Sequence, residues 1–307
     1  MAFGGYPPPH HILADLGLDA EVDSDTSARV RTRVTPFVTG ADGGVRAGVL
    51  ATLVDVVGGA VGVRALRPDW MATADLTIQV VRPARGPFVE ARGRVLRRGR
   101  TTLVIEAGVF EVDGDGSDVT CGAAVPAPAA WATMTFAILS GGRPTRTSGA
   151  AAELADRWSF TGAGLDAPVV DVLGISVTDA GNGVVSLPVR EYLFNSIGAV
   201  QGGVMALLGE VAGEVALGAV DGSDDAVVVT DLQVAYLSLG RVGPIVSRTK
   251  VLGSGAGPGA VRRGTRRSAV VELLDDGADG RLTTVVNVVG TTVAAVPPDA
   301  VPAGSAS

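Results

Sequence analysis

The chain has 307 residues, 47% of them hydrophobic and 19% charged, with 25 Lys and Arg against 32 Asp and Glu. This composition is typical of a folded chain of one or two domains and excludes an intrinsically disordered protein. The net charge of -7 and a pI near 4.9 argue against a nucleic acid or an anionic membrane as partner, because both bind basic surfaces.

Residues that signal secretion or histidine chemistry are scarce. We find no signal peptide and no apolar run long enough to cross a bilayer, and Cys121 is the single cysteine, so we predict a cytoplasmic protein. Both histidines, His10 and His11, lie in the N-terminal segment, where order is least assured. A histidine-based triad or zinc site would have to recruit that segment. We therefore expect carboxylates and backbone groups to carry any chemistry, without a metal.

The first predicted elements in chain order are a long helix and the strands behind it. Small and aliphatic residues surround almost the whole circumference of residues 47–64, which indicates a helix buried on most sides. Gly-Pro, Arg-Gly and Asp-Gly pairs separate the β-rich runs, as short antiparallel connections require. The predicted strands of this half are 71–82, 88–96, 101–112 and 131–139.

Residues 140–158 are predicted to link two domains, one over 1–139 with an N-terminal extension and one over 159–307 with a C-terminal tail. The linker opens with SGGRPTRTSG, and its end, 150–158, is expected to form a short helix. The second domain repeats the pattern of the first. It has a predicted helix over 203–219 and predicted strands over 226–237, 245–252 and 268–274.

The two predicted helices begin alike. The first opens with RAGV and the second with QGGV, and in each a carboxylate, Asp55 or Glu210, follows nine positions after the opening polar residue. The two carboxylates are 155 residues apart, and the pairs DL, GP and VL recur at offsets of 156 or 157. The sequence therefore predicts two copies of one α+β unit, each with a long central helix wrapped by an antiparallel sheet.

The segments AGVLATLVDVVGG, ADLTIQVVRPARGP and VLRRGRTTLVIEAGVFEVDG resemble the PaaI-like hotdog-fold thioesterases of the 4HBT superfamily. The second half is similar but more divergent, with its match concentrated in NSIGAVQGGVMALLGE and TDLQVAYL. The resemblance implies a double hotdog that hydrolyses acyl-CoA thioesters in lipid metabolism. It implies no cofactor, since coenzyme A enters only as part of the substrate. A homo-oligomer of double hotdogs is also expected.

Thioester hydrolysis needs a donor for the developing oxyanion and a carboxylate that acts as base or nucleophile. In the family each site is composite. Transferred onto this sequence, one site combines Asp55 and Thr73 of the first half with Asn195, Gln201 and Gly202 of the second. Gly202 supplies the oxyanion amide, and Gln201 replaces the usual histidine.

The reciprocal site is incomplete by the same resemblance. It would combine Glu210 with Gly40, Arg46 and the amide of Ala47, but Val229 stands where a hydroxyl is expected. We therefore predict one competent site around Asp55 and one decayed or repurposed site around Glu210.

Each of these residues also has a structural interpretation. A buried carboxylate can simply pair with an arginine, and Asn195 can cap a turn. The arginines of the first half are either contacts for the coenzyme A phosphates or solvated turn charges. The candidate phosphate contacts are Arg82, Arg97, Arg98 and Arg100.

The sequence favours an acyl-CoA thioesterase that acts on a hydrophobic or aryl acyl group, and two other functions are alternatives to it. The first is a catalytically inactive module that binds or senses acyl-CoA, which the missing His-Gly-Gly opening motivates. The second is a hotdog hydratase, whose family places a histidine five residues after the acid. Ala60 and Val215 occupy those positions here, which argues against a hydratase.

Overall fold

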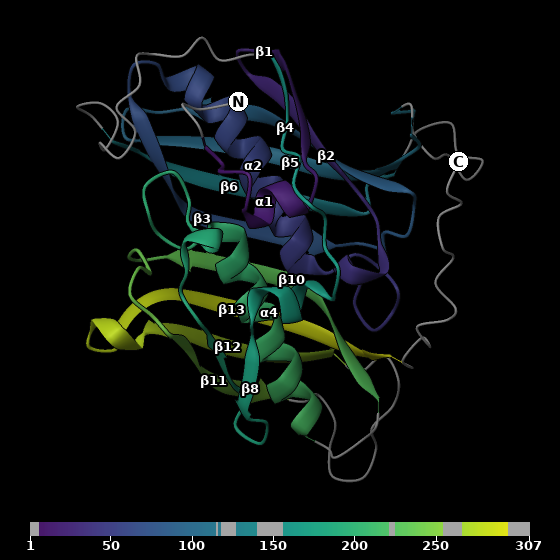
Figure 1. Ribbon diagram of the computed structural model, residues 1–307, viewed down its shortest axis with the longest axis vertical. Coiled ribbons are helices and arrows are strands. Elements are labelled where there is room, and N and C mark those ends of the chain that lie inside the picture. Colours follow the sequence, from purple (N-terminus) through teal and green to yellow (C-terminus); the bar gives the residue numbers. More distant parts are fainter. Residues whose placement is uncertain are drawn as a thin grey trace.

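The computed structural model describes residues 6–114, 116–117, 127–139, 156–220, 225–253 and 266–293. Two long helices, α2 (Ala47–Leu66) and α4 (Gly202–Ala219), lie against one antiparallel sheet of thirteen strands. Figure 1 shows the first half, purple to blue, stacked on the second half, green to yellow, with one long helix in each. Each helix is packed against its own half of the sheet.

The sheet runs continuously from one half into the other. In spatial order the strands of the first half are β7 (Arg157–Ser159), β1 (Asp19–Ser24), β2 (Ser27–Arg33), β4 (Phe88–Arg98), β5 (Thr102–Val112), β6 (Ala130–Leu139) and β3 (Trp70–Val80). The second half continues with β10 (Ala226–Tyr236), β13 (Arg281–Val293), β12 (Arg266–Asp275), β11 (Ile245–Gly253), β9 (Val184–Leu187) and β8 (Ser176–Asp179). The short helices are α1 (Ile12–Asp15), α3 (Val169–Leu173) and the 3-10 turns Pro36–Val38, Glu191–Leu193 and Asp276–Ala278.

Strands β3 and β10 join the two halves. They pair antiparallel, and the repeated DL anchors meet there: Leu76 lies opposite Val234, and Leu232 lies opposite Ile78. Leu76, Ile78, Leu232 and Val234 are all fully buried. The seam therefore belongs to a shared core and is more than an edge contact between two domains.

The two long helices touch near their first turns. A Cβ on Gly203 would lie 2.5 Å from the Cα of Thr52, and a Cβ on Gly48 would lie 2.6 Å from the Cβ of Leu207. These two glycine contacts are equivalent under the 155-residue offset. Glycine is required at both positions because no side chain fits in so close a crossing. The crossing places the start of each helix beside the middle of the other, and this sets the geometry of the site.

The structure agrees with most of the predicted elements and corrects others. Both long helices and the strands predicted behind them are present within a few residues of the expected bounds. The strands β1, β2, β8, β9 and β13 were not predicted. Charged residues alternate with apolar ones in β1 and β2, β8 and β9 have four residues each, and β13 carries a run of Val and Thr that the prediction passed over. The helix predicted over 150–158 is wrong at its end, where Trp158 lies in strand β7 and pairs with Ala20 of β1. Most of the predicted linker, 140–155, lies outside the described residues.

The expectation that no apolar run could cross a bilayer also needs correction. By length and composition α2 and α4 would pass as membrane spans, with mean hydropathies of 1.8 and 1.3. Both are mostly buried inside the protein, which is what the core helix of a folded domain requires.

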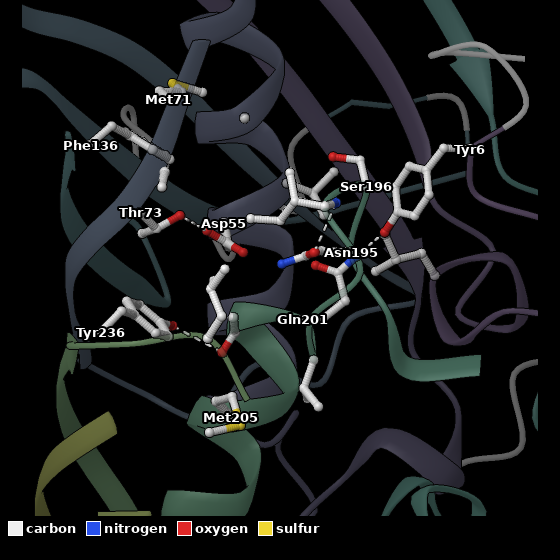
Figure 2. Close-up of a pocket in the computed structure, with 18 of the residues that line it drawn as sticks. Tyr6, Asp55, Met71, Thr73, Phe136, Asn195, Ser196, Gln201, Met205 and Tyr236 are labelled. Atoms are coloured by element: carbon white, nitrogen blue, oxygen red, sulfur yellow. Dashed lines mark hydrogen bonds between the residues drawn. The ribbon is translucent and has the colours of Figure 1, made fainter. Parts of the chain in front are cut away.

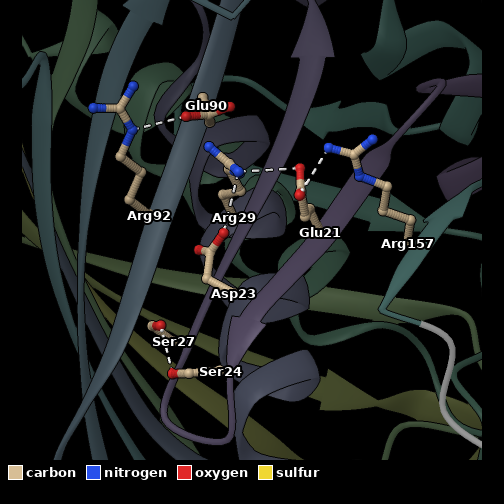
Figure 3. A network of polar contacts seen from close by, with 8 residues as sticks. All are labelled: Glu21, Asp23, Ser24, Ser27, Arg29, Glu90, Arg92 and Arg157. Atoms are coloured by element: carbon tan, nitrogen blue, oxygen red, sulfur yellow. Dashed lines mark hydrogen bonds and ion pairs between the residues drawn. The ribbon is translucent and has the colours of Figure 1, made fainter.

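The outer face of the first half of the sheet carries paired charges (Figure 3). The guanidinium of Arg29 lies 3.1 Å from Glu21 and 3.2 Å from Asp23, and Arg157 donates to Glu21 at 2.8 Å. A polar hollow of about 470 Å³ lies over this network. Because its arginines already have carboxylate partners, this face has the character of a solvated surface and not of an anion site.

Candidate active site

A cavity of about 210 Å³ lies where α2, the start of α4, β3 and β10 meet. It is lined by all five residues that the sequence grouped into one composite site: Asp55, Thr73, Asn195, Gln201 and Gly202. Figure 2 shows four of them, Asp55 and Thr73 from the first half and Asn195 and Gln201 from the second, around one space. The predicted grouping therefore agrees with the geometry, although the residues are up to 147 positions apart in sequence.

Asp55 occupies the middle of this cavity. Its Oδ1 accepts a hydrogen bond of 2.8 Å from the Thr73 hydroxyl, and among the described residues this hydroxyl, not an arginine, is its hydrogen-bond partner. Burial raises the pKa of Asp55 from 3.8 to about 6, while the bond from Thr73 lowers it. A carboxylate whose pKa lies near neutral pH suits a general base or a nucleophile. As a purely structural contact it would lower stability, because its charged form is buried without a cationic partner in the described part of the chain.

The start of α4 faces this carboxylate. Gly202 is the first residue of the helix, and a Cβ added to it would lie 2.9 Å from Oδ2 of Asp55. Its carbonyl accepts a hydrogen bond of 2.9 Å from the Tyr236 hydroxyl, which fixes the orientation of this turn. The first amides of a helix have no partner within the helix and lie at its positive end. The turn can therefore stabilise negative charge next to Asp55.

Asn195 forms a turn, as its structural interpretation predicts. Its Oδ1 accepts hydrogen bonds of 3.1 Å from the amides of Ile197 and Ala199, closing the loop before α4. The side-chain nitrogen is left over, and in Figure 2 it points toward Asp55. A turn role and a contact to substrate are thus compatible, because they use opposite ends of the amide.

Gln201 is held by a residue that the sequence did not single out. Its Nε2 donates to the hydroxyl of Tyr6, which also lines the cavity. Tyr6 and both histidines belong to the described part of the N-terminal segment. The side chain of buried His11 accepts from the amide of Leu13 and contacts the carbonyl of Phe194. Neither histidine lines the cavity, and burial lowers the pKa of His11, so it acts as a structural anchor.

The cavity has an apolar side and a polar side. Met71 and Phe136 lie together on one side of Asp55 in Figure 2. The other large apolar lining residues, also half-buried or buried, are Val63, Trp70, Trp158 and Phe160. Across Asp55 Figure 2 shows polar side chains, the half-buried Asn195 and Ser196 and the buried Gln201. The half-buried Ser238 and the exposed Leu239 also line the cavity. Such a gradient suits a ligand with an apolar group at one end and a hydrated chain at the other.

The reciprocal position around Glu210 is closed. The carboxylate of Glu210 accepts hydrogen bonds from the first two amides of α2, from Ala47 at 3.0 Å and Gly48 at 2.8 Å. Arg46 lies 3.8 Å from Glu210 and also pairs with Glu214. The extra methylene of Glu210, compared with Asp55, lets its carboxylate reach the amides that a substrate oxyanion would need. The predicted donor Ala47 is therefore already occupied.

The structure does not bring the predicted phosphate-binding arginines to the cavity. Arg82 pairs with Glu111, and Arg98 donates to the carbonyl of Ala65 at 2.7 Å. Arg97, near the end of β4, and Arg100, in the turn after it, are exposed and do not line the cavity. Arg241 lies nearer, because its guanidinium donates to the carbonyl of the lining residue Ile197 at 3.3 Å. The internal repeat could have pointed to Arg241. Its counterpart Arg85, 156 positions earlier, donates in the same way to the backbone carbonyl of Asp42.

Known proteins resemble the chain in sequence and in fold. The thioesterase superfamily model matches residues 43–117, which contain Asp55 and Thr73. A predicted esterase of Halobacterium salinarum is 34% identical over 128 residues, which cover 38% of this chain and 83% of that protein.

Two solved structures match over nearly the full length of both chains. The tesB protein of Mycobacterium avium subsp. paratuberculosis has a TM-score of 0.55 at 13% identity, covering 92% of this chain and 98% of its own. A predicted thioesterase of Novosphingobium aromaticivorans has a TM-score of 0.57 at 16% identity, covering 89% and 97%. At these identities the two structures are evidence for the fold alone.

Proposed function

The chain belongs to the thioesterase superfamily, and we propose that it is an acyl-CoA thioesterase built as a double hotdog. The proposal that both units are hotdogs is supported by the two wrapped helices and by solved thioesterase structures that match across nearly the whole chain. The domain limits of 1–139 and 159–307, the cytoplasmic location and a homo-oligomeric state remain predictions from the sequence.

The observation that carries the proposal is the position of Asp55, a buried carboxylate with a raised pKa facing the first turn of a helix. The thioester carbonyl would lie against that turn, where the Gly202 amide donates to the oxygen as negative charge develops. Asp55 would attack the carbonyl carbon or remove a proton from an attacking water, and the C–S bond would break to release coenzyme A, whose sulfur takes up a proton. If Asp55 attacks, water then hydrolyses the acyl-Asp55 anhydride and restores the carboxylate. Thr73 holds the carboxylate in place through Oδ1 and leaves Oδ2 toward Gly202.

The remaining polar residues would position the substrate. Gln201 is held by Tyr6 beside the oxyanion donor, in the place of the family's histidine, and Asn195 presents its amide nitrogen. The apolar side of the cavity would take the acyl group, and the polar side would take the pantetheine chain. For the coenzyme A phosphates we propose Arg241 at the polar side, ahead of Arg82, Arg97, Arg98 and Arg100.

We propose a single working site per chain. At the other site Glu210 fills the oxyanion position of α2, and Arg46 with Glu214 fills the space around it. This arrangement supports a structural role for the second cluster, because paired and hydrogen-bonded charges inside a protein are costly to disturb.

A panel of acyl-CoA thioesters, read out by release of free thiol, tests the function. Wild-type protein should release thiol from substrates with apolar acyl groups, Asp55→Asn should not, and Glu210→Gln is the matched control that should retain activity. If wild type binds acyl-CoA in calorimetry but releases no thiol, the chain is the inactive binding module. If Glu210→Gln abolishes activity and Asp55→Asn keeps it, the two sites are assigned the wrong way round.

A further inference from the structure

Gly59 is a helical glycine beside the cavity that packing does not explain. It lies one turn after Asp55 on the same face of α2 and lines the cavity, and a Cβ added to it would meet no atom within 4 Å. The other glycines of this part of α2, Gly58 and Gly62, are in close contact with their surroundings. A Cβ on Gly58 would lie 2.7 Å from the sulfur of Met134, and one on Gly62 would clash with Met71. Glycine is unfavourable inside a helix, so what Gly59 contributes is empty space next to Asp55.

The repeat shows what fills this position when it is not empty. Under the 155-residue offset Gly59 corresponds to Glu214 of α4, whose carboxylate pairs with Arg46. The space beside Glu210 is therefore filled by a salt bridge, whereas the equivalent space beside Asp55 is open. The same helix position thus distinguishes the open cavity from the closed one.

The open space lies on the apolar side of Asp55. Gly59 shares this side with Met71 and Phe136, both of which Figure 2 shows across Asp55 from Asn195 and Ser196. An acyl group entering from the polar side would pass Asp55 and end over Gly59. An engineered apolar cavity of about 150 Å³ holds benzene. On this scale the whole cavity of about 210 Å³, part of which the pantetheine chain would fill, limits the acyl group to at most about eight carbons, straight or aromatic.

Building on the proposed thioesterase function, we infer that Gly59 sets the size of the acyl group this site accepts, by leaving room over α2 for the end of a medium-length or aryl acyl chain. A side chain at this position would shorten the cavity without touching Asp55, Thr73 or Gly202. The upper limit of acyl length should therefore fall as the side chain at residue 59 grows. Each methylene excluded from apolar burial should weaken binding by about fourfold.

The test is a graded series, Gly59→Ala, Gly59→Val and Gly59→Leu, assayed on straight-chain acyl-CoA thioesters from butyryl to decanoyl and on phenylacetyl-CoA. Gly59→Leu should lower kcat/KM for octanoyl-CoA at least tenfold while butyryl-CoA changes less than threefold. Gly59→Ala should shift the profile least. Hydrolysis of butyryl-CoA by each variant shows that it has folded.

Gly218→Leu is the matched control, because Gly218 also lies in a long helix, has no atom within 4 Å of an added Cβ and does not line the cavity. It should leave the acyl profile unchanged. The inference is overturned if the Gly59 series keeps the wild-type profile or if Gly218→Leu shifts it equally. If wild type releases no thiol at all, the proposed function fails. The same series is then read by calorimetry with non-hydrolysable alkyl-CoA thioethers, where an unchanged length preference overturns the role of Gly59.

Discussion

Replacing Asp55 by asparagine should remove activity and at the same time stabilise the protein. Asparagine has nearly the same shape and can still accept the hydrogen bond from Thr73, so the change isolates the charge. Without a base or nucleophile, hydrolysis should fall by about 10²–10⁴-fold. The free energy of unfolding should rise at the same time, because a buried ionised carboxylate is no longer required in the folded state.

The size of the stabilisation follows from the pKa. The pKa of Asp55 is about 6 in the folded protein against an ordinary value of 3.8, a difference worth about 3 kcal/mol. Because the folded protein holds this proton more tightly than the unfolded chain, Asp55 lowers stability by this full amount only well above pH 6. Below about pH 4 the carboxyl is neutral in both states and the penalty is absent. For a chain of this length 3 kcal/mol corresponds to a rise of about 5 °C in Tm at pH 8.

Thermal unfolding of wild type and Asp55→Asn at pH 8, 6 and 4 checks this expectation, with Asp166→Asn as the control because Asp166 is exposed outside the cavity. The gain in Tm should be largest at pH 8 and should shrink as the pH falls through 6. A variant that is inactive but no more stable than wild type at pH 8 would refute the argument from burial. A fully active variant would refute the catalytic assignment itself.

Three further outcomes are expected. Glu210→Gln should lower the free energy of unfolding by about 1–3 kcal/mol, measured by urea denaturation, because the amide nitrogen of glutamine cannot accept a hydrogen bond and leaves one of the amides of Ala47 and Gly48 without an acceptor; thiol release should change less than about threefold. Thr73→Val should raise the pKa of Asp55 further, so that the acidic limb of the kcat/KM profile, which rises with pH through about 6, moves to higher pH. Tyr6→Phe should free Gln201, raising KM severalfold with a smaller effect on kcat in steady-state kinetics; an unchanged KM would show that Tyr6 does not position this side chain.

The sequence by itself determined the repeat, the two buried helices and the family. These features are local or periodic: apolar residues around a whole helix, strand runs bounded by turn residues, and a carboxylate nine positions into each repeat. The five residues of the composite site could be grouped because their positions match recognised motifs residue by residue, while their catalytic roles stay predictions. The strands β1 and β2 were missed, since pairing to neighbours stabilises them more than their own alternating pattern predicts.

The sequence favoured Asp55 over Glu210 by its complete set of motif residues, but only the tertiary structure shows the physical reason why one carboxylate faces an open cavity and the other does not. Asp55 and Glu210 occupy equivalent positions, and one methylene decides whether the carboxylate stops short of the opposite helix or occupies its first amides. The part played by Tyr6 and the emptiness beside Gly59 depend on contacts between segments far apart in the chain. Such contacts are fixed by how the two halves cross, and no periodicity in the sequence records them.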